Sequence, residues 1–111
     1  MSRRDRQRLE DILVAINAIH EHLGRGTLTD GLVFDAVRAR LIEVGKAVKA
    51  LPNELLSLEP TLPWPQIARM RDQLAHRSFD TSHAIVGATV AEDLPEVEAA
   101  VRRLLSVDDS P

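Results

Sequence analysis

Apolar residues recur at intervals of three and four along most of this chain, and this spacing constrains the fold more than any other feature. It places side chains on one face of an α-helix, whereas a half-buried strand would alternate every second residue. A first helix is predicted from about Arg4 to Leu23, where Gly24-Arg25-Gly26 ends it. Its apolar stripe consists of Leu9, Ile12, Leu13, Ile16, Ile19 and Leu23.

A second helix is predicted to begin after Thr29 or Asp30, either of which can cap it, and to run to about Leu51. The spacing of its stripe is that of a seam between two packed helices. The stripe consists of Phe34, Val37, Leu41, Val44, Val48 and Leu51. The middle of this stripe could form either the core of one protomer or an interface between two.

Prolines punctuate the chain after this pair of helices. Between Pro52 and Pro63 they allow at most a short helical turn around Leu55-Leu56, because proline lacks the backbone donor that a helix needs. Pro65 suits the first position of a third helix, where that donor is not used. In this helix Ile67, Met70 and Leu74 are expected to face inward.

A last helix is predicted to follow a break around residues 79–82, with Asp80 or Ser82 as its cap. Pro95 should kink this helix or divide it in two, and Ser106 to Pro111 should form a frayed tail. Its stripe consists of Ile85, Val86, Val90, Leu94, Val97, Val101 and Leu104. We therefore predict one all-α domain over residues 1–111, an up-and-down bundle of four to five helices with a short proline-rich connection.

The composition narrows the functional classes. A chain of 111 residues makes one domain without room for a large enclosed cofactor cavity. It contains no cysteine, which excludes disulfides and thiolate metal sites, and neither a metal nor a cofactor is expected. The net charge of −3 argues against a broad coating of nucleic acid but leaves room for a local basic site. With no signal peptide and no membrane-spanning run, a cytoplasmic protein is expected.

The strongest candidate chemistry lies in the third helix, at Arg71, Asp72 and His76. His76 follows Arg71 by five positions, which places the two about 140° apart around a helix axis. Asp72 lies between them in angle and can touch His76. Histidine can act as general base or acid near neutral pH, and a guanidinium can stabilise charge on a phosphate. RNA supplies its own nucleophile, the 2′-hydroxyl, so this pair permits metal-independent RNA cleavage.

The same residues have a structural interpretation, in which His76 simply ends a helix beside its dipole and Arg71 is solvated. Other basic residues are weaker candidates. Arg69 and Arg77 flank the motif and could contact an RNA backbone, as could the arginines between Arg3 and Arg8. The remaining histidines, His20, His22 and His83, are expected at the surface.

The run from Pro63 to Asp80 resembles the HepT family of HEPN-domain proteins. That family has a Pro-Trp-x-x-Ile-x-x-Met-Arg-Asn/Asp-x-x-x-His block followed by a short turn that contains an aromatic residue. The resemblance continues through Ala84-Ile85-Val86 and Glu92-Asp93-Leu94-Pro95. It reaches back to the segment Leu41 to Ala47, which looks like the family's Ile-Gly-Glu-Ala helix, so that most of the chain is covered in the expected order.

The resemblance implies a homodimer of HEPN type whose two Arg-x4-His motifs line one cleft and cleave RNA without metal. Such proteins are toxins of bacterial toxin–antitoxin pairs, neutralised by a small nucleotidyltransferase of the MntA type. Arg71 and His76 match the catalytic pair, and Asp72 matches the polar position that helps to order it.

Two residues depart from the family pattern. Ser78 stands where the family has a tyrosine that can receive AMP from the antitoxin, so Ser78, Thr81 or Ser82 would be a substitute acceptor, or inhibition would act by binding alone. Lys46 stands where the family often has glutamate, which we expect to be a surface or dimer-edge change. The Ser78 departure and the acidic net charge favour a second hypothesis, a catalytically silent helical partner of a nucleotidyltransferase, whereas the intact Arg71-Asp72-x-x-x-His76 favours the toxin. A third is a helical bundle with a purely structural role.

Overall fold

Helices make up almost the whole structure. The computed structural model describes residues 1–76 and 79–108. Helix α1 spans Arg3–Leu23, α2 spans Gly31–Lys49 and the short α3 spans Asn53–Leu56. Then come α4 at Trp64–His76, α5 at Phe79–Ala88, the π-helical turn η1 at Thr89–Asp93 and α6 at Leu94–Asp108. The predicted all-α class is confirmed.

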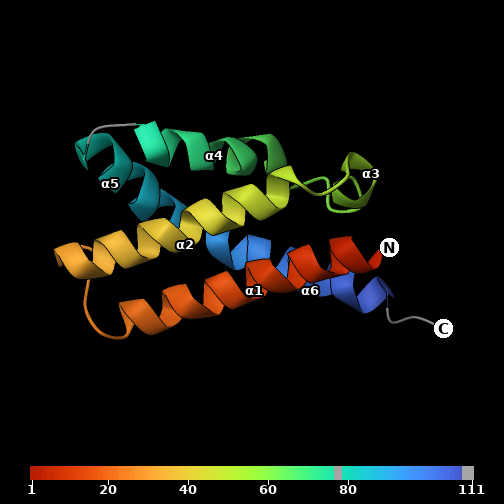
Figure 1. Cartoon of the computed structure of the whole chain (residues 1–111), viewed down its shortest axis with the longest axis horizontal. Coiled ribbons are helices and arrows are strands. Elements are labelled where there is room, and N and C mark those ends of the chain that lie inside the picture. Colours follow the sequence, from red (N-terminus) through yellow and green to blue (C-terminus); the bar gives the residue numbers. More distant parts are fainter. Residues whose placement is uncertain (77–78, 109–111) are drawn as a thin grey trace.

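The long helices run up and down beside one another (Figure 1). Helix α2 lies in the middle and packs along α1 on one side and α4 on the other. After α4, the chain returns through α5, which contacts α2 and α4, and then through α6, which contacts α1. Within the described ranges no helix is long and apolar enough to cross a membrane.

The seam predicted on α2 forms the core of a single protomer. Side chains at its centre are at most 1% exposed, and α2 packs here against α1 and α4. These central residues are Val37, Leu41, Val44 and Val48. The seam pattern therefore gives no support for a dimer, because the protomer itself already buries it.

The starts of α1 and α2 follow from short polar side chains. The Asp30 carboxylate accepts hydrogen bonds from the amides of Leu32, at 2.8 Å, and Val33, at 3.4 Å. Of the two predicted caps Asp30 is therefore correct, and Thr29 instead pairs with Thr27. The Ser2 hydroxyl caps α1 in the same way.

The second half of the chain differs from the prediction at three places. Helix α4 begins one residue before Pro65, and α5 begins at Phe79, so neither Asp80 nor Ser82 is its cap. The predicted frayed tail is also wrong in its first part, because residues 106–108 belong to α6. The division predicted at Pro95 is confirmed: α5 ends at Ala88, α6 begins at Leu94, and between them lies η1, where the amide of Leu94 donates to the carbonyl of Thr89.

Candidate active site on helix α4

Helix α4 is anchored through its first residue and its apolar face. Trp64 is buried, and its indole Nε1 donates to the carbonyl of Glu59 at 2.9 Å. One turn apart along the helix, Ile67, Met70 and Leu74 pack into the core. Because these residues fix which side of α4 faces inward, they also fix where its polar residues point.

The three candidate residues of the motif lie at different depths. Arg71 is half-buried at the edge of the apolar face, whereas Asp72 and His76 are exposed. Within the part of the chain that the structure describes, no hydrogen bond or ion pair joins Asp72 to His76. Helical geometry separates Arg71 from His76 by about 140° and about 7.5 Å along the axis. One protomer thus presents the pair from the edge and the outer side of a single helix, not as one enclosed cleft.

Gly45 of α2 brings the two helices together under Arg71. A Cβ at this position would lie 3.1 Å from the backbone nitrogen of Arg71 and 3.1 Å from the carbonyl oxygen of Ile67. Both atoms belong to the backbone and cannot swing away as a side chain could. The missing side chain therefore sets how closely α4 approaches α2 at the turn that carries Arg71. An isolated glycine inside an apolar helical stripe is a sequence signal of such an approach.

A second contact from α2 reaches the last turn of α4. The half-buried Arg38 donates from Nε and from Nη2 to the carbonyl oxygen of Leu74, at 3.1 Å and 2.7 Å. The sequence did not single out Arg38, because its partner is 36 residues away and only the packed helices bring them together.

The other predicted site residues divide between the surface and the interior. Arg69 is exposed on α4. Thr81 is exposed in the first turn of α5, but Ser82 is only 3% exposed, so modification of Ser82 would require local opening. Arg77 and Ser78 lie outside the described residues.

His83 is not the surface residue that the sequence suggested. It is half-buried, and its ring stacks on Phe34 with centroids 4.9 Å apart and an angle of 6° between the planes. Its Nε2 lies at hydrogen-bonding distance, 2.9 Å, from the carbonyl oxygen of Leu28. This residue therefore attaches α5 to the start of α2 and to the loop before it.

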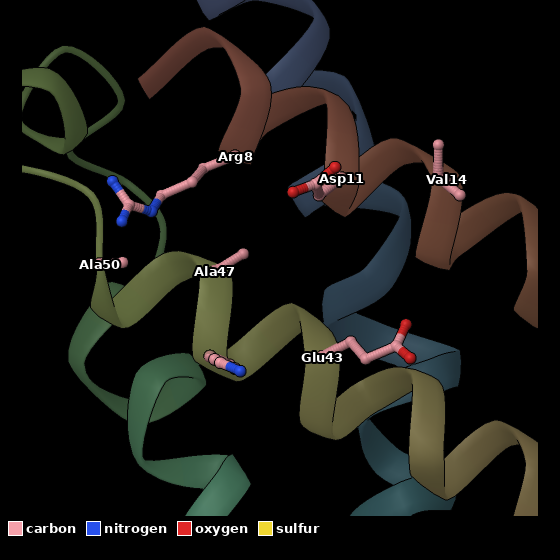
Figure 2. A pocket seen from close by; sticks show the side chains of 7 residues that line it. Arg8, Asp11, Val14, Glu43, Ala47 and Ala50 are labelled. Carbon is pink, nitrogen blue, oxygen red and sulfur yellow. The ribbon is translucent and has the colours of Figure 1, made fainter. Parts of the chain in front are cut away.

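Of the N-terminal arginines, Arg8 lines a groove between α1 and α2 (Figure 2). Arg8 lines this groove together with Lys46, and so do two acidic residues, Asp11 and Glu43. The charges on its walls are balanced, which does not favour a phosphate backbone there. Lys46 is exposed, as expected for a surface change.

Carboxylates and histidines do not gather into a metal-binding group in residues 1–76 and 79–108. No three or more of these side chains lie where they could hold one ion. His20 instead pairs with Glu98 of α6 at 3.4 Å.

Known proteins resemble this chain over nearly its whole length. A family model described as ribonuclease HepT-like matches residues 9–104, which includes the whole of α4. A protein of Thermococcus cleftensis named "Probable ribonuclease HepT" is 36% identical over 109 residues, 94% of this chain and 98% of its own length.

Two further relatives have names that begin with "Putative RNase". One, from Caldanaerobacter subterraneus, is 34% identical over 87% of this chain and 90% of its own length. The other, from Methanocaldococcus jannaschii, is 31% identical over 75% of this chain and 72% of its own. No solved structure gives a significant match. The family model covers far more than half of the chain and includes the Arg71–His76 motif, so this chain belongs to the HepT-like ribonuclease family.

Proposed function

We propose that this chain is the metal-independent ribonuclease toxin of a toxin–antitoxin pair, active in the cytoplasm as a homodimer. The observation that carries the proposal is the placement of Arg71 and His76 on α4. Arg71 is held half-buried against α2, and His76 stands exposed in the last turn. Membership of a ribonuclease family supports the same activity.

The proposed reaction is transesterification within the RNA. His76, as general base, takes the proton from a 2′-hydroxyl, whose oxygen attacks the neighbouring phosphorus. The bond to the 5′-oxygen breaks, and that oxygen leaves with a proton that it takes from water. Arg71 stabilises the negative charge that builds on the phosphoryl oxygens. The products are a 2′,3′-cyclic phosphate and a 5′-hydroxyl end, and DNA is not a substrate because it lacks the nucleophile.

A second copy of the chain would supply what one protomer lacks. His76 is exposed to solvent, so RNA bound at His76 of a lone protomer would stay in contact with water. In a homodimer with α4 helices facing each other, the Arg71 and His76 of both copies would line one cleft, Asp72 helping to order the pair. Arg69 would contact the RNA backbone at its rim.

The partner that we propose for the toxin is a nucleotidyltransferase antitoxin of the MntA type. Its target on this chain would lie after α4, where Thr81 is exposed and Ser82 is buried. A binding partner without catalytic activity is the competing function, because serine at position 78 lacks the reach of the family's tyrosine.

The test is cleavage of total bacterial RNA in the presence of EDTA. Wild-type protein should leave 2′,3′-cyclic phosphate ends, and His76→Ala should leave the RNA intact. The matched control is His20→Ala, which removes an exposed histidine of α1 that pairs with Glu98 of α6. If folded, dimeric wild-type protein leaves the RNA intact, the ribonuclease is rejected and the silent binding partner takes its place.

A further inference from the structure

The contact between Arg38 and the carbonyl of Leu74 links α2 to the end of α4. Two nitrogens of one guanidinium share this oxygen, at 3.1 Å and 2.7 Å, and the side chain is half-buried. Nε and Nη2 of arginine are fixed in one plane, so a contact made by both restricts the orientation of the oxygen as well as its distance. The bond therefore holds the peptide that follows Leu74.

This carbonyl lies in the last described turn of α4, close to His76. Helix α4 ends at His76, only two residues after Leu74. Arg38 thus supplies a donor from another helix to the turn on which His76 stands.

We infer that Arg38 is a positioning residue for His76, an inference that rests on the proposed ribonuclease function. Helix α2 then sets α4 at two points. Gly45 fixes the turn that carries Arg71 by close backbone approach, and Arg38 fixes the turn that carries His76 by hydrogen bonding. Because the reacting groups must meet one phosphate, a shift of either turn by about 1 Å is expected to cost up to about 100-fold in rate.

The experiment compares Arg38→Ala, Arg38→Lys and a matched control in steady-state cleavage of one RNA oligonucleotide. The control is Arg40→Ala, on the same helix, whose guanidinium makes an exposed pair with Glu43 at 3.2 Å. Arg38→Ala should lower kcat by about 10- to 100-fold with KM changed less than about twofold. Arg38→Lys should recover part of kcat, because an ammonium can still donate to the carbonyl. Arg40→Ala should match the wild type.

A second readout does not depend on activity. Amide hydrogen exchange of residues 74–76 should speed up in Arg38→Ala while that of α1 stays unchanged. An active wild type with unaltered kcat and unaltered exchange in Arg38→Ala would overturn this inference alone. So would a raised KM with unchanged kcat, since that result makes Arg38 a phosphate contact. A wild type that cleaves no RNA would overturn the proposed function and the inference with it.

Discussion

Glu59 shows how one residue can connect three parts of this chain. Its carbonyl accepts the indole hydrogen bond of Trp64, and its carboxylate accepts from Nε of Arg103 at 3.0 Å. The hydrogen bond from Arg103 holds the pKa of the Glu59 carboxyl below its usual range. The start of α4 is in this way tied to α6.

A pH-dependent contribution to stability follows from this pair. Because the folded-state pKa of Glu59 is lowered, its pair with Arg103 stabilises the fold above the unfolded-state pKa, about 4.3. This stabilisation is lost as the pH falls through the folded-state pKa. Arg103→Ala should therefore lower the Tm at pH 7 and have little effect on the Tm below the folded-state pKa of Glu59. Thermal melts between pH 7 and pH 3 would show it, with Glu59→Gln as the matched variant. A Tm difference that persists at pH 3 contradicts the assignment.

Two arginines on α4 should separate chemistry from binding. Arg71→Ala should lower kcat by about 100- to 1000-fold, the usual loss for one donor at developing charge. Arg69 is exposed, so Arg69→Ala should raise KM and reduce the salt dependence of binding by about one unit in log–log slope. Cleavage rates across a salt series would measure both. Equal effects of the two substitutions on kcat would reject these separate roles.

Among the elements, the crossing of α2 and α4 leaves little room for a side chain at Gly45. Gly45→Ala places a methyl group 3.1 Å from two backbone atoms of α4, so the helices must separate. We expect a loss of about 1–3 kcal/mol in the free energy of unfolding and a lower rate of RNA cleavage. Gly87→Ala is the control, because nothing lies within 4 Å of its Cβ and alanine is favoured there by up to about 1 kcal/mol. Urea unfolding of both would measure this; equal stabilities would contradict the close approach.

Much of this fold could be predicted, because local spacing and capping determine most of its helices. The stripes of α1 and α2, the cap at Asp30 and the short turn at Asn53–Leu56 depend on residues close together in sequence. The contacts that were missed depend on distant partners. Arg38 meets Leu74 and His83 meets Leu28 across the bundle, and no pattern within a helix indicates such pairs.

For the molecule as a whole, the sequence predicted which helix carries the candidate site but could not predict whether one protomer completes it. The Arg71–His76 motif falls on α4 as expected, with its predicted apolar face buried. Whether two protomers share the site could not be derived from the α2 seam, because that stripe is the core of one protomer. The homodimer therefore stays a prediction.

Mixing two inactive variants would test a shared site. If catalysis uses Arg71 of one protomer and His76 of the other, Arg71→Ala and His76→Ala proteins, mixed and allowed to exchange subunits, should form one intact site per mixed dimer. Half of the dimers would be mixed, and each would hold one of two sites, so about a quarter of wild-type activity should return. Each variant alone stays inactive. No recovery despite proven exchange would place both residues of a working site on one chain.

The π-helical turn η1 has a consequence for how one helical segment serves two neighbours. An extra residue in a turn changes the phase of the helix after it. Helix α5, with Val86 buried, can thus pack against α2 and α4, while α6, with Val97 and Val101 buried, packs against α1. Removing one residue from Thr89–Asp93 would restore regular winding and rotate α6 by about 100°. The turn thus shifts the helical phase. The number of residues in this segment, more than their identity, lets α5 and α6 bury their apolar faces against different helices.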